Sequence, residues 1–122
     1  FDFLGKDNLP NAHYSAIITN PPYGKGNRDA VEFARLALER CPGMVALLLT
    51  AKFDFGKTRK FLFQDNPRFM AKIALLDRIQ WFEGATTGTE DHAWYVWGAN
   101  VNQAEYPKLL WGERNPNKRG HE

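Results

Sequence analysis

The chain has a single cysteine, Cys41, and no long hydrophobic run. One cysteine excludes an internal disulfide framework and every zinc site built from several cysteines, which favours a reducing, cytoplasmic compartment. The longest apolar run, Met44–Leu49, is far shorter than the roughly twenty residues that span a bilayer, and no signal peptide opens the chain. The sequence therefore predicts a cytoplasmic protein that does not enter a membrane.

An excess of charge of one sign is also lacking. Sixteen Lys and Arg against fourteen Asp and Glu leave a net charge of +2, which is too small for coating nucleic acid by electrostatics alone. The only serine, Ser15, has no Gly-x-Ser-x-Gly setting, which argues against a serine hydrolase. The histidines lack the spacing of metal ligands, so no metal site is expected. Any contact with nucleic acid should be local.

What is present is the composition of one packed globular domain of 122 residues, with 43% hydrophobic residues, and the order of its strand and helix patterns predicts an α/β fold. The apolar, β-branched run Tyr14–Thr19 predicts a buried strand that stops at Asn20-Pro21-Pro22, because two prolines cannot continue a central strand. Apolar residues then recur at helical period from Val31 to Leu38, and Asp29 and Glu32 stand at the spacing of a capping box. These patterns predict a strand, a turn and a helix.

The helical pattern ends at Cys41-Pro42-Gly43, and the next apolar run, Met44–Thr50, predicts a parallel strand covered on both faces. Strand, helix and strand would form one crossover unit. Residues 53–63 predict a loop entering a short helix, which Asp65-Asn66-Pro67 closes.

Three further strands are predicted in the second half of the chain. Lys72–Phe82 and Ala93–Gly98 flank a polar loop, which favours an antiparallel pair. Tyr106–Trp111 predicts a last short strand, and residues 115–122 form a polar tail without an apolar anchor.

The most informative residues are Asn20-Pro21-Pro22-Tyr23. A match to Asn, Asp or Ser followed by two prolines and an aromatic residue arises by chance in roughly one chain in a few hundred of this size. Ligands of open α/β sheets bind in the crevice outside the carboxyl ends of the strands, which is where this tetrapeptide falls. A rigid Pro-Pro turn without a ligand is the alternative interpretation.

With this tetrapeptide the sequence resembles the amino-group DNA methyltransferases that use S-adenosylmethionine, in which it follows the fourth strand. Asp2-Phe3-Leu4, Ile17–Tyr23, Lys57–Phe63 and Ala93–Trp97 follow the order seen in short, prophage-type adenine methyltransferases. Asn at the first position is similar to the adenine N6 branch. The resemblance implies the C-terminal portion of a Rossmann-like methyltransferase sheet, mixed with one antiparallel strand, with S-adenosylmethionine as cofactor and DNA as partner.

The residue types suit that chemistry. An exocyclic amino nitrogen is a poor nucleophile, and acceptors for both of its hydrogens favour a pyramidal, reactive form. The side-chain oxygen of Asn20 and the backbone oxygen of Pro21 are the expected acceptors, and the rings of Pro21 and Pro22 fix their direction. Tyr23 would stack on a base flipped out of the duplex. The methyl group would transfer in line from the sulfonium by proximity and orientation.

The resemblance also implies that Asp2 contacts the adenine ring of the cofactor, although a solvated carboxylate is an equal alternative. Basic residues that flank the tetrapeptide or follow the next strand are expected either to bind phosphates or to form a solvated surface: Lys25, Arg28, Lys57, Arg59 and Lys60.

The glycine-rich loop and the acidic residue that hold the cofactor in this family are absent from the sequence. We therefore expect residues 1–114 to be a truncated catalytic domain, with Tyr14–Thr19 as an exposed sheet edge that favours a homodimer. Two alternatives stay open. The chain is a non-catalytic remnant serving assembly or weak nucleic-acid binding, or it methylates an amino nitrogen of RNA guanine or an amide nitrogen of protein.

Overall fold

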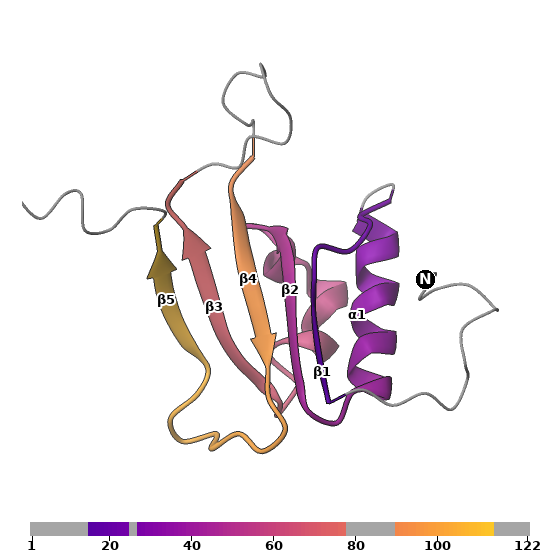
Figure 1. Cartoon of the computed structure of the whole chain (residues 1–122), viewed down its shortest axis with the longest axis vertical. Helices are drawn as coiled ribbons and strands as arrows, with labels where there is room; N and C mark the ends of the chain where they lie inside the picture. Colours follow the sequence, from indigo (N-terminus) through magenta and orange to yellow (C-terminus); the bar gives the residue numbers. More distant parts are fainter. Residues whose placement is uncertain (1–14, 25–26, 78–89, 114–122) are drawn as a thin grey trace, which may run out of the picture.

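The computed structural model describes residues 15–24, 27–77 and 90–113. They form an α/β fold with a five-stranded sheet (Figure 1). The elements in chain order are β1 (Ala16–Thr19), α1 (Arg28–Arg40), β2 (Met44–Thr50), the 3₁₀ helices η2 (Phe53–Phe55) and η3 (Lys57–Leu62), β3 (Phe69–Leu75), β4 (His92–Trp97) and β5 (Lys108–Gly112).

The sheet is mixed, with the order β1-β2-β4-β3-β5. β1 pairs with β2 in parallel, and β3 pairs with β5 in parallel. β4 lies between β2 and β3 and runs antiparallel to both of them. It is therefore the one antiparallel strand of the sheet, as expected. The antiparallel pairing of the strands on either side of the polar loop is confirmed as well.

The predicted crossover unit of β1, α1 and β2 is also confirmed. α1 ends at Arg40, and the backbone N–H of the cap residue Cys41 donates to the Ala37 oxygen. The turn before β2 approaches the segment before β1 closely, since a Cβ atom built on Gly43 would lie 1.9 Å from the Ser15 oxygen. Only glycine fits at such a distance.

The main core lies between one face of the sheet and the helices. Alternate residues of β2 and β4 point into it, as the period of a strand requires. It contains these buried side chains: Ala30, Phe33, Ala34, Ala37, Cys41, Val45, Leu47, Leu49, Phe53, Leu62, Phe63, Phe69, Ala93, Tyr95 and Trp97. A smaller cluster of Ala46, Ala71 and Val96 lies on the other face. The residues of β2 after Met44 are thus buried on both faces, as its continuous apolar run predicted.

The prediction of a buried first strand was wrong. β1 lies at the edge of the sheet and its residues alternate between exposed and half-buried, with Ile18 61% exposed. Ile17, on the opposite face, packs against the main core. The exposed edge itself had been expected, and within the described residues β1 pairs only with β2.

The predicted capping box was wrong as well. The N-cap of α1 is Asn27, in the left-handed conformation with φ 63° and without a side-chain capping bond. Asp29 lies in the first turn, where its charge suits the helix dipole. Glu32 pairs with Arg35 instead of reaching back to the cap, and this hydrogen bond lowers the pKa of Glu32.

β3 begins at Phe69, three residues before the predicted start at Lys72. The Asn66 side-chain oxygen accepts the backbone N–H of Arg68 at 2.9 Å, so the turn after η3 is short and extended structure resumes at once. The end of the predicted strand, residues 78–82, and the polar tail 115–122 lie outside the described residues. The predicted short helix is two 3₁₀ helices separated by Gly56.

Arg68 connects three separate parts of the fold. Its guanidinium group donates to the backbone oxygens of Leu38, Cys41 and Gly43 at 2.9, 2.8 and 2.7 Å. It also donates to the Gly98 oxygen at 2.8 Å, just after β4. The carboxyl end of α1, the turn into β2 and the end of β4 are thereby held together.

No helix in the described part of the chain has both the length and the apolar character needed to traverse a bilayer.

Candidate functional site

The tetrapeptide Asn20–Tyr23 leaves the carboxyl end of β1, at the edge of the sheet where the parallel strand β2 also ends. Asn20 is exposed, Pro21 is buried, and Tyr23 is half-buried. The register pairs Thr19 with Leu47, so β2 continues beyond the last residue of β1. The Tyr23 hydroxyl donates to the Leu48 oxygen in that continuation, at 2.9 Å. The side chain that sequence reasoning placed at the site is therefore anchored on the neighbouring strand.

Tyr23 has three further attachments. Its ring stacks on that of His92 in β4, with 6.3 Å between centroids and 27° between planes. Its backbone oxygen accepts the N–H groups of Asp29 and Ala30 in the first turn of α1, at 3.1 and 3.3 Å. Burial, and then the charge of Glu90, raise the pKa of the Tyr23 hydroxyl. Tyr23 is consequently a neutral donor at physiological pH.

The turn between Tyr23 and α1 requires glycine at position 24. Gly24 has φ +68°, and a Cβ atom there would lie 2.6 Å from Asp29 Cγ and 2.9 Å from Asp29 Cβ. The Gly24 oxygen also accepts the Asn27 N–H at 3.3 Å. This geometry fixes how Asn20–Tyr23 joins the helix.

We expect Gly24→Ala to lower the free energy of unfolding by about 2 kcal/mol, because both the left-handed backbone and the contact with Asp29 oppose a side chain. Urea denaturation measures the difference. Gly56→Ala is the matched control, since a Cβ atom at Gly56 would meet no atom nearer than 3.4 Å. Equal stability of the two variants would contradict the expected role of Gly24.

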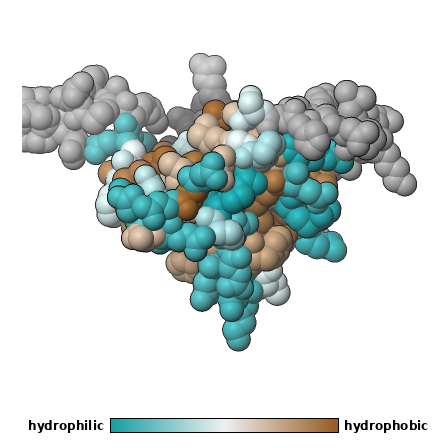
Figure 2. All heavy atoms as spheres, turned by 90° about the horizontal axis from the view of Figure 1, so that it is seen from below, coloured by the Kyte–Doolittle hydropathy of each residue, from teal (hydrophilic) through white to brown (hydrophobic). Residues whose placement is uncertain are grey.

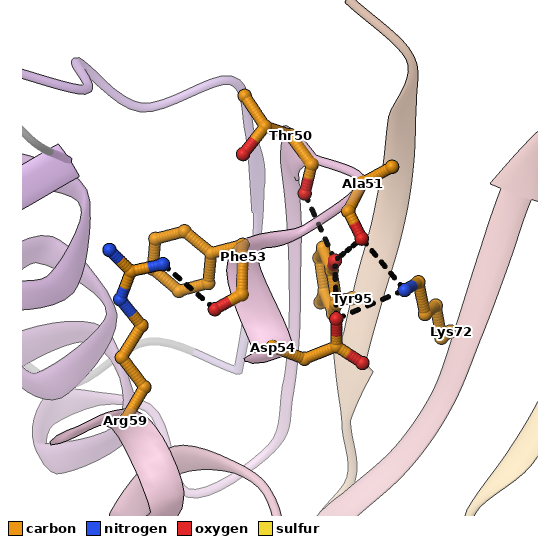
Figure 3. A network of polar contacts seen from close by, with 7 residues as sticks. All are labelled: Thr50, Ala51, Phe53, Asp54, Arg59, Lys72 and Tyr95. Carbon is orange, nitrogen blue, oxygen red and sulfur yellow. Dashed lines mark hydrogen bonds and ion pairs between the residues drawn. The ribbon is translucent and has the colours of Figure 1, made fainter. Parts of the chain in front are cut away.

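A polar network lies where β2 ends (Figure 3). The Tyr95 hydroxyl lies 3.0 Å from the backbone oxygens of both Thr50 and Ala51. The Asp54 carboxylate lies 3.3 Å from this hydroxyl and 3.0 Å from Lys72 Nζ, which also donates to the Ala51 oxygen at 2.8 Å. Burial and the Asp54 charge raise the pKa of Tyr95. The network fixes the turn from β2 into η2.

No spacing in the sequence indicates this network, because Asp54, Lys72 and Tyr95 come from η2, β3 and β4. The only sequence signal is that each is a polar residue within a largely apolar segment. Such residues need partners when a sheet buries them.

The predicted phosphate-binding residues fall into different settings. Lys25 lies outside the described residues, as does Asp2, the predicted contact to the cofactor, and Arg28 is exposed at the start of α1. The Arg59 guanidinium donates to the Phe53 oxygen at 2.9 Å and lies 4.5 Å from the centroid of the Phe53 ring (Figure 3). Arg59 therefore has a structural role between η2 and η3.

Lys57 and Lys60 are exposed and line a cleft of about 590 Å³ between η2 and η3. The cleft is also lined by Asp54, Phe55, Gly56, Thr58, Phe63 and Gln64. Two of the five predicted basic residues are thus brought together on one surface, next to the segment that follows β2.

A second cleft of about 590 Å³ lies at the opposite end of the sheet, lined by residues that precede β3 and β5, among them Asn66, Pro67, Tyr106 and Pro107. Figure 2 looks at the molecule from that end, where hydrophobic and hydrophilic residues are intermixed. Within residues 15–24, 27–77 and 90–113, no group of three or more His, Cys, Asp or Glu side chains is placed to hold a metal ion.

Comparison with protein-family models, with curated proteins and with solved structures finds no match to this chain. The fold and the site define an α/β protein with a mixed five-stranded sheet and an Asn-Pro-Pro-Tyr turn, with Asn20 exposed, at the carboxyl end of its first described strand.

Proposed function

We propose that this chain is the catalytic segment of a DNA adenine N6 methyltransferase that acts through Asn20–Tyr23. The observation that carries the proposal is the position of the tetrapeptide: it leaves the carboxyl end of β1 with Asn20 exposed and Tyr23 anchored to β2. In open α/β sheets, ligands bind in the crevice outside the carboxyl ends of the strands.

The backbone around Asn20 suits a pair of fixed acceptors. Pro21 is buried, and the hydrogen bond of Tyr23 to Leu48 fixes the other end of the turn. In the proposed reaction the Asn20 side-chain oxygen and the Pro21 backbone oxygen accept the two hydrogens of the adenine amino group. His92 occupies one face of the Tyr23 ring, so a flipped base would stack on the opposite face.

The strand directions in the sheet also support the proposal, at the level of the fold. Its single antiparallel strand, β4, agrees with the mixed, Rossmann-like methyltransferase sheet that the resemblance implies. The tetrapeptide lies between β1 and α1 in the crossover β1-α1-β2, and this position supports the proposal because the family signature also follows a strand.

S-adenosylmethionine is the cofactor of the proposed reaction, and it supplies the methyl group as a sulfonium. Isothermal titration calorimetry of the chain with S-adenosylmethionine, in the presence and absence of DNA, tests the proposal. The glycine-rich loop and the acidic residue that hold the cofactor in this family are absent from the sequence, so saturable binding, the expected result, requires that dimerisation or another segment of the chain completes the cofactor pocket. Absence of binding under both conditions would contradict a catalytic role for this chain and favour the non-catalytic alternative.

The exposed β1 edge favours a second, compatible role in self-assembly. Ile18 is 61% exposed, and among the described residues β1 pairs only with β2; such an edge pairs readily with another chain. We expect a homodimer of twice 14.0 kDa in analytical ultracentrifugation, and a shift toward the monomer in Ile18→Lys.

Leu110→Lys provides the matched control for this prediction, because Leu110 is 44% exposed on β5 at the other edge of the sheet. It should leave the dimer intact. A monomer at every concentration tested, or a dimer that persists in Ile18→Lys, would contradict pairing through β1.

A further inference from the structure

Phe55 is the most exposed of the large hydrophobic residues in the described part of the chain, at 74%. It ends η2, directly after the turn that the Asp54 network fixes. Lys72 Nζ lies over the ring at 5.5 Å from its centroid. The Phe55 ring thus makes a cation–π contact with a lysine of the sheet, while most of its surface remains accessible to solvent.

The cleft beside Phe55 contains two exposed lysines, Lys57 and Lys60. Both belong to η3. A 3₁₀ helix has three residues per turn, so side chains three positions apart lie on the same face, about 6 Å apart along the axis. The two ammonium groups can therefore contact successive phosphates of an extended strand, and Thr58 lines the same cleft.

Among the described residues that line this cleft, the one carboxylate, Asp54, is already paired. Asp54 Oδ1 lies 3.0 Å from Lys72 Nζ, and both side chains are about four-fifths buried, with 22% and 19% exposure. The charge offered to a ligand is then that of Lys57 and Lys60. An aromatic ring with an accessible face next to two cations is the combination that binds single-stranded nucleic acids.

We propose that the cleft between η2 and η3 binds unpaired nucleotides of DNA, with a base stacked on Phe55 and adjacent phosphates bound by Lys57 and Lys60. This inference deepens the proposed function and rests on it for the identity of the strand as DNA. The strand around a flipped base is partly unstacked, and this surface would hold such a segment next to the turn that follows β2.

Fluorescence anisotropy of a labelled single-stranded oligodeoxynucleotide of about 12 nucleotides tests the proposal without cofactor. We expect Phe55→Ala to weaken binding about 5- to 150-fold, the range that loss of one stacked base produces. Phe55→Tyr keeps the π-face and should bind like the unaltered chain, whereas Phe55→Leu keeps only the apolar volume and should not.

The two lysines are tested by the dependence of affinity on salt. Lys57→Gln and Lys60→Gln should each lower the slope of log affinity against log salt concentration by about 0.7. The matched controls are Leu110→Ala and Lys108→Gln, which alter exposed residues on the other face of the sheet, since they pair with Ile73 and Ala71. Both should bind unchanged.

Binding that is unaffected by Phe55→Ala, or no binding by the unaltered chain, would overturn this inference. Its failure can be told apart from failure of the proposed function. If Phe55→Ala loses oligonucleotide affinity but the chain transfers no methyl group, the inference stands and the catalytic proposal fails. If methyl transfer occurs and Phe55→Ala binds the oligonucleotide normally, the catalytic proposal stands and this inference fails.

Discussion

Asn20→Ala should lower kcat/KM for methyl transfer to DNA by a factor of about 10² to 10³, the usual effect of removing one preorganised hydrogen-bonding group from an active site. The thermal midpoint should stay the same. Asn20 is exposed and follows the last residue of β1, so its side chain contributes little to the core. The lost activity would therefore reflect the missing acceptor for the amino hydrogens.

Two variants sharpen this prediction. Asn20→Asp keeps an oxygen acceptor at the same distance from the backbone and should retain more activity than Asn20→Ala. Asn100→Ala removes an exposed amide from the loop after β4 and should be fully active. An Asn20→Ala variant with unaltered activity would exclude the proposed mechanism. Loss of activity together with unfolding would show a structural role for Asn20 instead.

The largest loss of stability is expected for Arg68→Met. This substitution keeps much of the aliphatic length but removes every donor to the Leu38, Cys41, Gly43 and Gly98 oxygens. Hydrogen bonds from charged groups contribute about 1.5–3 kcal/mol each and are not additive, so we expect a loss of about 3–4 kcal/mol in the free energy of unfolding. Urea denaturation followed by circular dichroism measures it.

Arg35→Gln is the control for Arg68. The Arg35 guanidinium pairs with Glu32 and Glu39 on the exposed face of α1, with side-chain exposures between 46% and 62% for the three residues. Exposed pairs of this kind contribute less than about 1 kcal/mol. If Arg68→Met and Arg35→Gln cost the same, the carbonyl contacts of Arg68 would not be what holds α1 and the end of β4 together.

Local signals in the sequence were enough to predict the first half of the fold. The prolines after Thr19 end β1, the helical period of Val31–Leu38 marks α1, and Pro42-Gly43 ends it. The insertion of β4 between β2 and β3 has no local signal, because it depends on which faces of three strands bury together. The exposure of β1 at the sheet edge likewise follows from strand order and not from its apolar composition.

The same distinction holds for the candidate site. Asn20–Tyr23 was found from four consecutive residues, because their identity and their place after a strand are both local. The anchors of Tyr23, Leu48 and His92, come from two other strands. Arg68 was missed, since its acceptors lie about thirty residues away on both sides of it in the chain. Phe55 was passed over because an aromatic residue in a mixed segment usually predicts burial.

Transfer of an isotope-labelled methyl group from S-adenosylmethionine to DNA, followed by nucleoside analysis, tests the central claim most directly. The account predicts labelled N6-methyladenine with the unaltered chain and a loss of at least about a hundredfold in Asn20→Ala. Label in another nucleoside, in RNA or protein alone, or in no acceptor at all would contradict the assignment of Asn20–Tyr23 to adenine N6 methylation of DNA.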